Sequence, residues 1–306
     1  MPEEYESHKA LRQCQNYITE GYSYAVDIDL EKFFDKVNHS KLIEVLSGRI
    51  KDGRVISLIH KYLNAGIVVK HKFEPSQQGV PHGGPLSPLL SNIMLNELDR
   101  ELEARGHRFV RYADDMVILC KSKRSARRIL ESITRFIEGK LFLRVNKEKS
   151  KVCYIREVKF PGYSFYKYKG KGRLMIHPKS VQKMKAKIKE LTSRSNGWGN
   201  ERRKEALRRY ITGWVLYFKL ADIDRLLVIT DEWYRRRIRM VIWKQWKRIR
   251  TRLKNLIKLG KNKSKAWEWA NTRKGYWRIA GSYILSRTIT NDRLREAGYV
   301  FFSEYY

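Results

Sequence analysis

The acidic residues of this 306-residue chain include four whose spacing suits metal-dependent chemistry. Asp114 and Asp115 are adjacent and stand between two apolar, β-prone runs, which predicts a hairpin with both carboxylates at its tip. Asp27 and Asp29 lie in another strand-like run, where a spacing of two places them on one face. Hard divalent cations prefer carboxylate oxygen. Carboxylates on adjacent strands suit two metal ions roughly 3.5–4 Å apart, which can stabilise both oxygens of a phosphoryl transfer. For an isolated Asp-Asp pair, a solvated turn is the alternative.

The elements that must position these acids follow from hydrophobic periodicity. A Gly- and Pro-rich stretch, 79–88, predicts a shaped loop, because its prolines forbid regular helix and Gly permits close approach to a ligand. The mixture of a small sheet with helices packed on one side is α+β rather than a doubly wound sheet. Helices are predicted over 7–20, from Asn38 to 46, and over 54–64, 89–103 and 125–139, and strands over 109–120, 151–155, 158–166 and 173–177.

The composition favours a polyanionic partner. The net charge is +33, from 65 Lys and Arg against 32 Asp and Glu, and such a surface binds phosphates by counterion release. No apolar run approaches the roughly 20 residues that cross a bilayer, so membrane attachment is disfavoured. The start of the chain lacks a secretory signal. The three cysteines lack the spacing of a zinc or disulfide framework, so the cytoplasm is the expected location.

Charge becomes denser in the second half. Helices are predicted from Ser180, a candidate N-cap, to 191, then over about 200–219 and 223–250. From Arg235 to Lys265 there is no Asp or Glu, and tryptophans are interleaved with the cations. This pattern suits phosphate contact with stacking on bases. The alternative is a solvated helical face with the tryptophans in the core.

Motifs in a fixed order resemble those of bacterial group II intron reverse transcriptases. Tyr112-Ala113-Asp114-Asp115 is similar to the catalytic hairpin of that family. The other palm-like motifs are 26–39, 78–92, 146–150 and 160–165, and two further segments, 209–218 and 273–278, resemble the maturase region.

The resemblance implies a polymerase palm with remnant fingers over 1–178 and an all-helical thumb and maturase region over 179–306. It implies an RNA-directed DNA polymerase that uses two Mg²⁺ ions and assists intron splicing and mobility. Its partners would be group II intron RNA, an RNA template with a DNA primer, and dNTPs, with no membrane. The family's N-terminal finger region and C-terminal endonuclease are not recognised here, which leaves two alternatives: the product is truncated, or a second chain or a homodimer supplies the fingers.

Metal ligands are also implied by the resemblance. Asp29 and Asp114 would bridge both ions, the Leu30 carbonyl would add an oxygen, and Asp115 would be the looser ligand. Asp27 is the competing acid on the first strand.

Nucleotide contacts follow from the same resemblance. Phe34 would lie under the sugar and exclude a 2′-hydroxyl, while its neighbour Phe33 suits the core. His82, where the family usually has Gln, and Gly83 would contact the incoming nucleotide. Lys149 would serve as a general acid or neutralise charge at the leaving pyrophosphate.

Two nucleic-acid contacts complete the expectations. Phe160 and Gly162 resemble the turn that grips the primer terminus. The acid-free run is expected to bind RNA through Arg236, Arg239, Lys247, Arg250 and Lys254.

Two hypotheses therefore stand. The first is the polymerase just described. The second is a catalytically impaired splicing cofactor, or a truncated remnant, that binds RNA without polymerising. Three intact acids favour the first, since a scaffold gains nothing from packing carboxylates together, whereas His82 and the unrecognised fingers favour the second.

Overall fold

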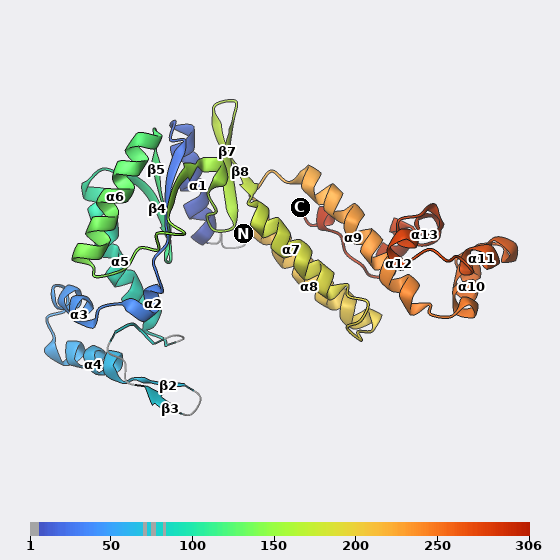
Figure 1. Cartoon of the computed structure of the whole chain (residues 1–306), viewed down its shortest axis with the longest axis horizontal. Helices are drawn as coiled ribbons and strands as arrows, with labels where there is room; N and C mark the ends of the chain where they lie inside the picture. The colour runs from blue at the N-terminus through green and yellow to red at the C-terminus, as the bar shows by residue number, and fades with distance from the viewer. Residues whose placement is uncertain (1–5, 70–71, 75–77, 82–83) are drawn as a thin grey trace. The chain divides into compact units, whose positions relative to one another are not determined.

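The computed structural model describes residues 6–69, 72–74, 78–81 and 84–306, which form two compact units, Met1–Leu174 (unit 1) and Met175–Tyr306 (unit 2). The boundary falls inside a strand, Lys171–Ile176 (β8), slightly before the division at 178 drawn from the sequence. Each unit is described by itself (Figure 1).

Unit 1 carries the mixed part of the fold. Its helices are α1 Glu6–Thr19, α2 Phe33–Lys36, α3 His39–Ser47, α4 Gly53–Asn64, α5 Ser87–Ala104 and α6 Lys123–Lys140. Its strands are β1 Tyr24–Ile28, β2 Ile67–Val69, β3 Lys72–Glu74, β4 Arg108–Tyr112, β5 Asp115–Cys120, β6 Lys151–Tyr154 and β7 Tyr163–Tyr168, with a 3-10 turn, η1, at Ile155–Glu157.

An antiparallel sheet in the order β4-β5-β1-β6 is the centre of unit 1, while β2 pairs with β3 and β7 with β8. One face of this sheet is apolar and lies against α5 and α6, which Figure 1 shows beside the strands. The alternation of side chains along a strand puts the acids on the opposite face. The apolar face is made by Val26, Ile28, Met116, Ile118 and Cys120, and the helices cover it with Leu90, Met94, Ile133 and Ile137.

Local sequence signals account for several helix starts. The Asn38 side chain accepts a hydrogen bond from the Lys41 backbone at 2.9 Å and begins α3, and Ser122 caps α6 through the Ser125 backbone at 3.2 Å. Ser180 is not the cap of the first helix of unit 2: that helix begins at Pro178, and the His177 ring accepts from the Lys179 backbone. Proline suits the first turn, where its missing N–H has no partner to lose.

Unit 2 is helical apart from its share of β8. Its elements are α7 Pro178–Leu191, α8 Asn200–Phe218, α9 Asp224–Gln245, α10 Ile249–Lys258, α11 Lys263–Ala270, α12 Tyr276–Ala280, α13 Tyr283–Thr288, α14 Asn291–Glu296 and the 3-10 turn η2 Phe302–Glu304.

The α+β prediction is confirmed, with two corrections to its elements. The helix expected over 223–250 is interrupted after Gln245, where Arg252 donates to the Trp246 carbonyl at 3.1 Å and holds the chain in a turn. The strand expected from 158 begins only at Tyr163. No helix among the described residues is long and apolar enough to cross a membrane.

Candidate functional site

Strand register brings the two acidic segments together. Ile28 of β1 pairs with Met116 of β5 as the last pair of their ladder, so Asp29 and Asp115 follow at the same end of the sheet. Asp29 is close enough to Asp115 to raise the pKa of the Asp115 carboxyl. Asp114 occupies the second position of the two-residue turn between β4 and β5. The hairpin and the face shared by Asp27 and Asp29 therefore occur as the sequence predicts.

Cations flank this acidic face from β6 and the loop before it. Asp27 pairs with Lys151 in the register of β1 and β6. Lys149 Nζ lies 3.5 Å from Asp29 Oδ2, and the lysine is 69% exposed. A solvated pair of this kind contributes little stability, so Lys149 is free to move toward another anion.

Burial and mutual repulsion perturb the acids. Burial raises the pKa of Asp27 to about 6, with Asp115 and Asp29 adding to the rise and Lys151 and Lys159 opposing it. The pKa of Asp115 is also raised, first by desolvation of its carboxyl and then by Asp114. The four carboxylates therefore interact electrostatically, which is the condition that a bound cation relieves.

Asp29 is fixed by its backbone rather than by its carboxylate. Its N–H donates to Ser150 Oγ at 3.0 Å, and its carbonyl accepts from the Asn146 N–H at 2.9 Å. Leu30, the proposed carbonyl ligand, forms an isolated bridge with Val145 in the same connection. Asp29 Oδ2 is shielded from solvent and accepts no hydrogen bond within the described residues, although Lys149 Nζ lies 3.5 Å away as a counter-charge. A shielded carboxylate oxygen without a hydrogen bond suits a cation, because leaving it unbonded is costly.

The donor set fits a divalent cation in type and strand position but is not yet closed around one. Within 6–69, 72–74, 78–81 and 84–306, no three His, Cys, Asp or Glu side chains converge closely enough to hold an ion. Asp114 and Asp115 are exposed at the hairpin tip, where rotation of the side chains requires no change of register. If a metal binds here, the acids must turn inward to complete the site.

The predicted nucleotide gate lies beside the predicted nucleotide loop. Val80 N–H donates to the Phe34 carbonyl and Gly79 N–H to the Val37 carbonyl, both at 2.7 Å. Gly79 has a φ of +87°, and a Cβ there would meet the Asp35 carbonyl oxygen at 2.7 Å, so Gly is required. Phe34 is partly buried, whereas Phe33 is 4% exposed and belongs to the core, as predicted. His82 and Gly83 lie outside the described residues.

The two residues predicted to grip the primer lie in a tight turn. Phe160 N–H donates to the Tyr163 carbonyl at 2.9 Å, and Gly162 has a φ of +86°. The Phe160 side chain is fully buried. Any contact with a primer at this turn must therefore come from its backbone or from its exposed neighbours.

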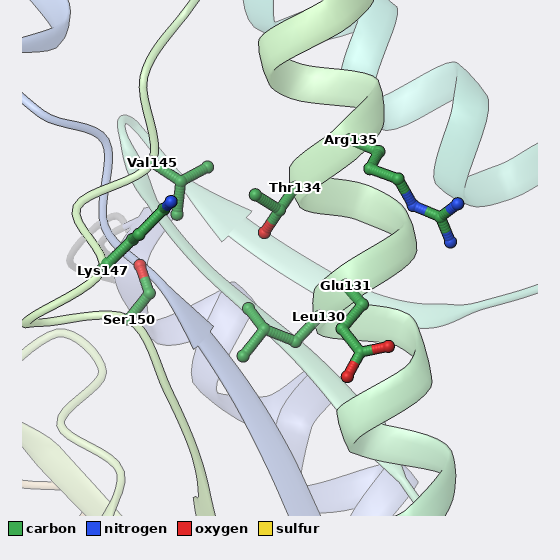
Figure 2. Close-up of a pocket in the computed structure, with 7 residues that line it drawn as sticks. All are labelled: Leu130, Glu131, Thr134, Arg135, Val145, Lys147 and Ser150. Atoms are coloured by element: carbon green, nitrogen blue, oxygen red, sulfur yellow. The ribbon is translucent and has the colours of Figure 1, made fainter.

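A pocket of about 460 Å³ lies between α6 and the segment 145–150. Figure 2 shows Thr134 and Leu130 of α6 on one side and Lys147 and Ser150 on the other. Ser150 links this pocket to the acidic face through its two hydrogen bonds with the Asp29 backbone.

The five predicted RNA contacts fall into two groups. Arg236 donates to the Trp277 carbonyl and stacks over that ring, with its guanidinium carbon 4.0 Å from the centroid. Arg239 donates to the Ile289 carbonyl at 2.8 Å, and burial lowers its pKa. Both arginines thus hold unit 2 together. The second group consists of Lys247, just before α10, and Arg250 and Lys254 on α10. All three side chains are exposed, and none makes a side-chain hydrogen bond or ion pair within the described residues.

Three residues near the acids were missed by sequence reasoning. The charge of Lys159 lowers the pKa of Asp27 and of Asp115. Ser150 positions Asp29 by accepting a hydrogen bond from its backbone N–H. The third, Arg111, directly precedes the Tyr-Ala-Asp-Asp motif and donates a hydrogen bond to Asp99 of α5. Adjacency to the motif was the one signal in the sequence that pointed to it.

Each unit contains a segment that matches a known protein family. Residues 3–165 match the family described as reverse transcriptase (RNA-dependent DNA polymerase). Residues 181–277 match the group II intron, maturase-specific domain.

Several individual proteins are similar to this chain. Protein YkfC of Escherichia coli is 32% identical over 188 residues, which cover 49% of each chain. The group II intron-encoded protein LtrA of Lactococcus lactis is 27% identical over 221 residues, covering 51% of this chain and 37% of LtrA. The chain thus spans about half or less of the length of these relatives. A Candida albicans telomerase, solved with a fragment of telomeric RNA, aligns with 95% of this chain and 52% of its own at 12% identity and a TM-score of 0.46.

Proposed function

This chain belongs to the reverse transcriptase family, and from that premise we propose that it is an RNA-directed DNA polymerase that also binds group II intron RNA. The observation that carries the proposal is that the pairing of β1 with β5 ends at Ile28 and Met116, so that Asp29 and Asp115 follow at the same end of the sheet, with Asp114 in the adjoining turn. Its substrates are dNTPs and a DNA primer on an RNA template.

We propose that Asp29, Asp114 and Asp115 hold two Mg²⁺ ions, with the Leu30 carbonyl as a further oxygen ligand. When bound, the ions neutralise charge on the attacking and leaving oxygens. Lys149 then turns from Asp29 toward the leaving pyrophosphate, where its ammonium stabilises charge or delivers a proton. Phe34 excludes a 2′-hydroxyl, and the loop held to its backbone orients the nucleotide.

Unit 2 supplies the second activity. Its match to the maturase-specific domain supports RNA binding that assists splicing. The exposed cations of α10 and of the segment just before it are the best candidates for phosphate contact. Arg236 and Arg239 instead donate hydrogen bonds to backbone carbonyls within unit 2.

Primer extension tests the proposal. The full chain should extend a DNA primer on an RNA template with dNTPs and Mg²⁺, and Asp114→Asn should remove the extension without changing RNA affinity. Glu103→Gln, which alters an exposed acid of α5, is the matched control and should extend normally. RNA binding without extension by the wild-type chain would support the alternative of a splicing cofactor that no longer polymerises.

A further inference from the structure

Arg111 makes an unusually complete set of hydrogen bonds behind the catalytic hairpin. Its Nε donates to Asp99 Oδ1 at 2.8 Å and its Nη2 to Asp99 Oδ2 at 2.6 Å. Its Nη1 donates to Asn92 Oδ1 at 3.0 Å and to the Ala113 carbonyl at 2.8 Å. The Arg111 and Asp99 side chains are 15% and 18% exposed. A shielded bidentate pair has a fixed geometry that a lysine cannot reproduce.

The turn that this arginine contacts is strained. Ala113 has a φ of +55°, a left-handed conformation that residues with a Cβ rarely adopt. The next two residues are the adjacent acids Asp114 and Asp115, whose charges repel. The hydrogen bond from Arg111 to the Ala113 carbonyl therefore stabilises the strained residue of the turn.

The other ends of the network belong to α5. Asn92 and Asp99 both lie on this helix, which starts at Ser87 directly after the loop held against α2. Ser87 Oγ also donates to the Pro81 carbonyl at 2.5 Å. Because strand neighbours point to opposite faces, Arg111 reaches α5 from the apolar side while the acids stay on the other side.

We propose that Arg111 is a positioning residue that ties the turn carrying Asp114 to α5, so that the metal-binding acids and the nucleotide loop keep one geometry. The inference rests on the proposed function, since it assigns Arg111 to the metal site of that reaction. A plain stability role is the competing explanation. It predicts that changing Arg111 lowers the melting temperature and leaves the metal affinity of the folded protein unchanged.

Mn²⁺ binding by the full chain, measured by electron paramagnetic resonance of the free ion, separates the two explanations. The Asp114→Asn variant serves as the zero reference for binding at the hairpin. Arg111→Lys keeps the charge but loses the fork, and the Kd for Mn²⁺ should rise about tenfold, the lower end of the effect of residues that support metal ligands. Asn92→Ala, an exposed and mild change, should raise the Kd by a smaller factor.

Arg105→Lys is the matched control. Arg105 also donates to a carboxylate, Glu101 Oε1, at 2.8 Å in unit 1, but it contacts α6 rather than the hairpin. The Kd of the Arg105→Lys variant for Mn²⁺ should stay within about twofold of the wild-type value, a smaller change than is expected for a residue that supports a metal ligand.

Each outcome bears on the inference. Wild-type Mn²⁺ affinity in folded Arg111→Lys overturns it, and so does a wild type that binds no more Mn²⁺ than Asp114→Asn. If Arg111→Lys does not fold, unchanged affinity in Asn92→Ala overturns it. A wild type that binds Mn²⁺ in this Arg111-dependent way but extends no primer leaves the inference standing and removes the proposed polymerase function.

Discussion

The acidic face of unit 1 and the basic helices of unit 2 both concentrate charge of one sign, but they place it differently. In unit 1, the register of β1 and β5 ends at Ile28 and Met116, so the backbone brings Asp29 and Asp115 to the same end of the sheet. In unit 2, α9 arginines turn inward onto backbone carbonyls, as Arg239 does at Ile289. The difference teaches that strand spacing predicts which acids share a face, whereas a count of cations on a helix does not distinguish a cation that contacts a partner from one that holds the fold.

The largest expected effect tests the register in unit 1. Asp29→Asn should lower primer extension about a thousandfold, because loss of a metal ligand costs several kcal/mol of transition-state stabilisation. Asp27→Asn should lower it much less, since Asp27 pairs with Val117 and so lies two positions farther from the hairpin tip than Asp29. Steady-state extension rates at saturating Mg²⁺ measure both. The reverse order of severity would assign the ligand to Asp27.

A smaller effect is expected at the nucleotide gate. Phe34→Ala should raise incorporation of ribonucleotides relative to deoxynucleotides by about 10- to 100-fold, the range that a steric change in a pocket commonly gives. Single-nucleotide incorporation kinetics measure the ratio. Phe33→Leu is the control: it should lower the melting temperature, because Phe33 is a core residue, and leave sugar selection unchanged. Equal selectivity in Phe34→Ala and wild type would mean that Phe34 is an ordinary core residue that does not select the sugar.

The basic side of the comparison is tested through salt dependence. Changing Lys247, Arg250 and Lys254 together to Gln should reduce the salt slope of RNA binding by about 2, at about 0.7 per single-stranded phosphate contact. A titration of affinity against salt measures the slope. The same change at exposed Lys123, Arg124 and Arg127 of α6 is the control for net charge. Matching slopes in the two triple variants would remove α10 from the RNA interface.

The smallest effect concerns an inward-facing arginine. Arg239→Gln should destabilise unit 2 by about 1–3 kcal/mol, because it leaves the Ile289 carbonyl and Asn291 without their donor. Its RNA salt slope should stay that of wild type. Thermal unfolding and the same salt titration measure both quantities. A flattened slope with an unchanged melting temperature would mean that Arg239 contacts RNA after all.

The sequence by itself determined the α+β class, the hairpin at Tyr112–Asp115 and the common face of Asp27 and Asp29. These follow from periods of two and from local turn chemistry, which neighbouring residues decide. The resemblance added the family, which the matches over residues 3–165 and 181–277 bear out.

Tertiary structure decided what depends on residues far apart in the chain. Arg111 meets Asp99 and Asn92 only because β4 packs against α5, and Gly79 is required only because its loop crosses the α2 backbone. The inward use of Arg236 and Arg239 likewise depends on segments dozens of residues away. A sequence pattern records residue type and local spacing, whereas the partner of a long cationic side chain is set by packing between elements.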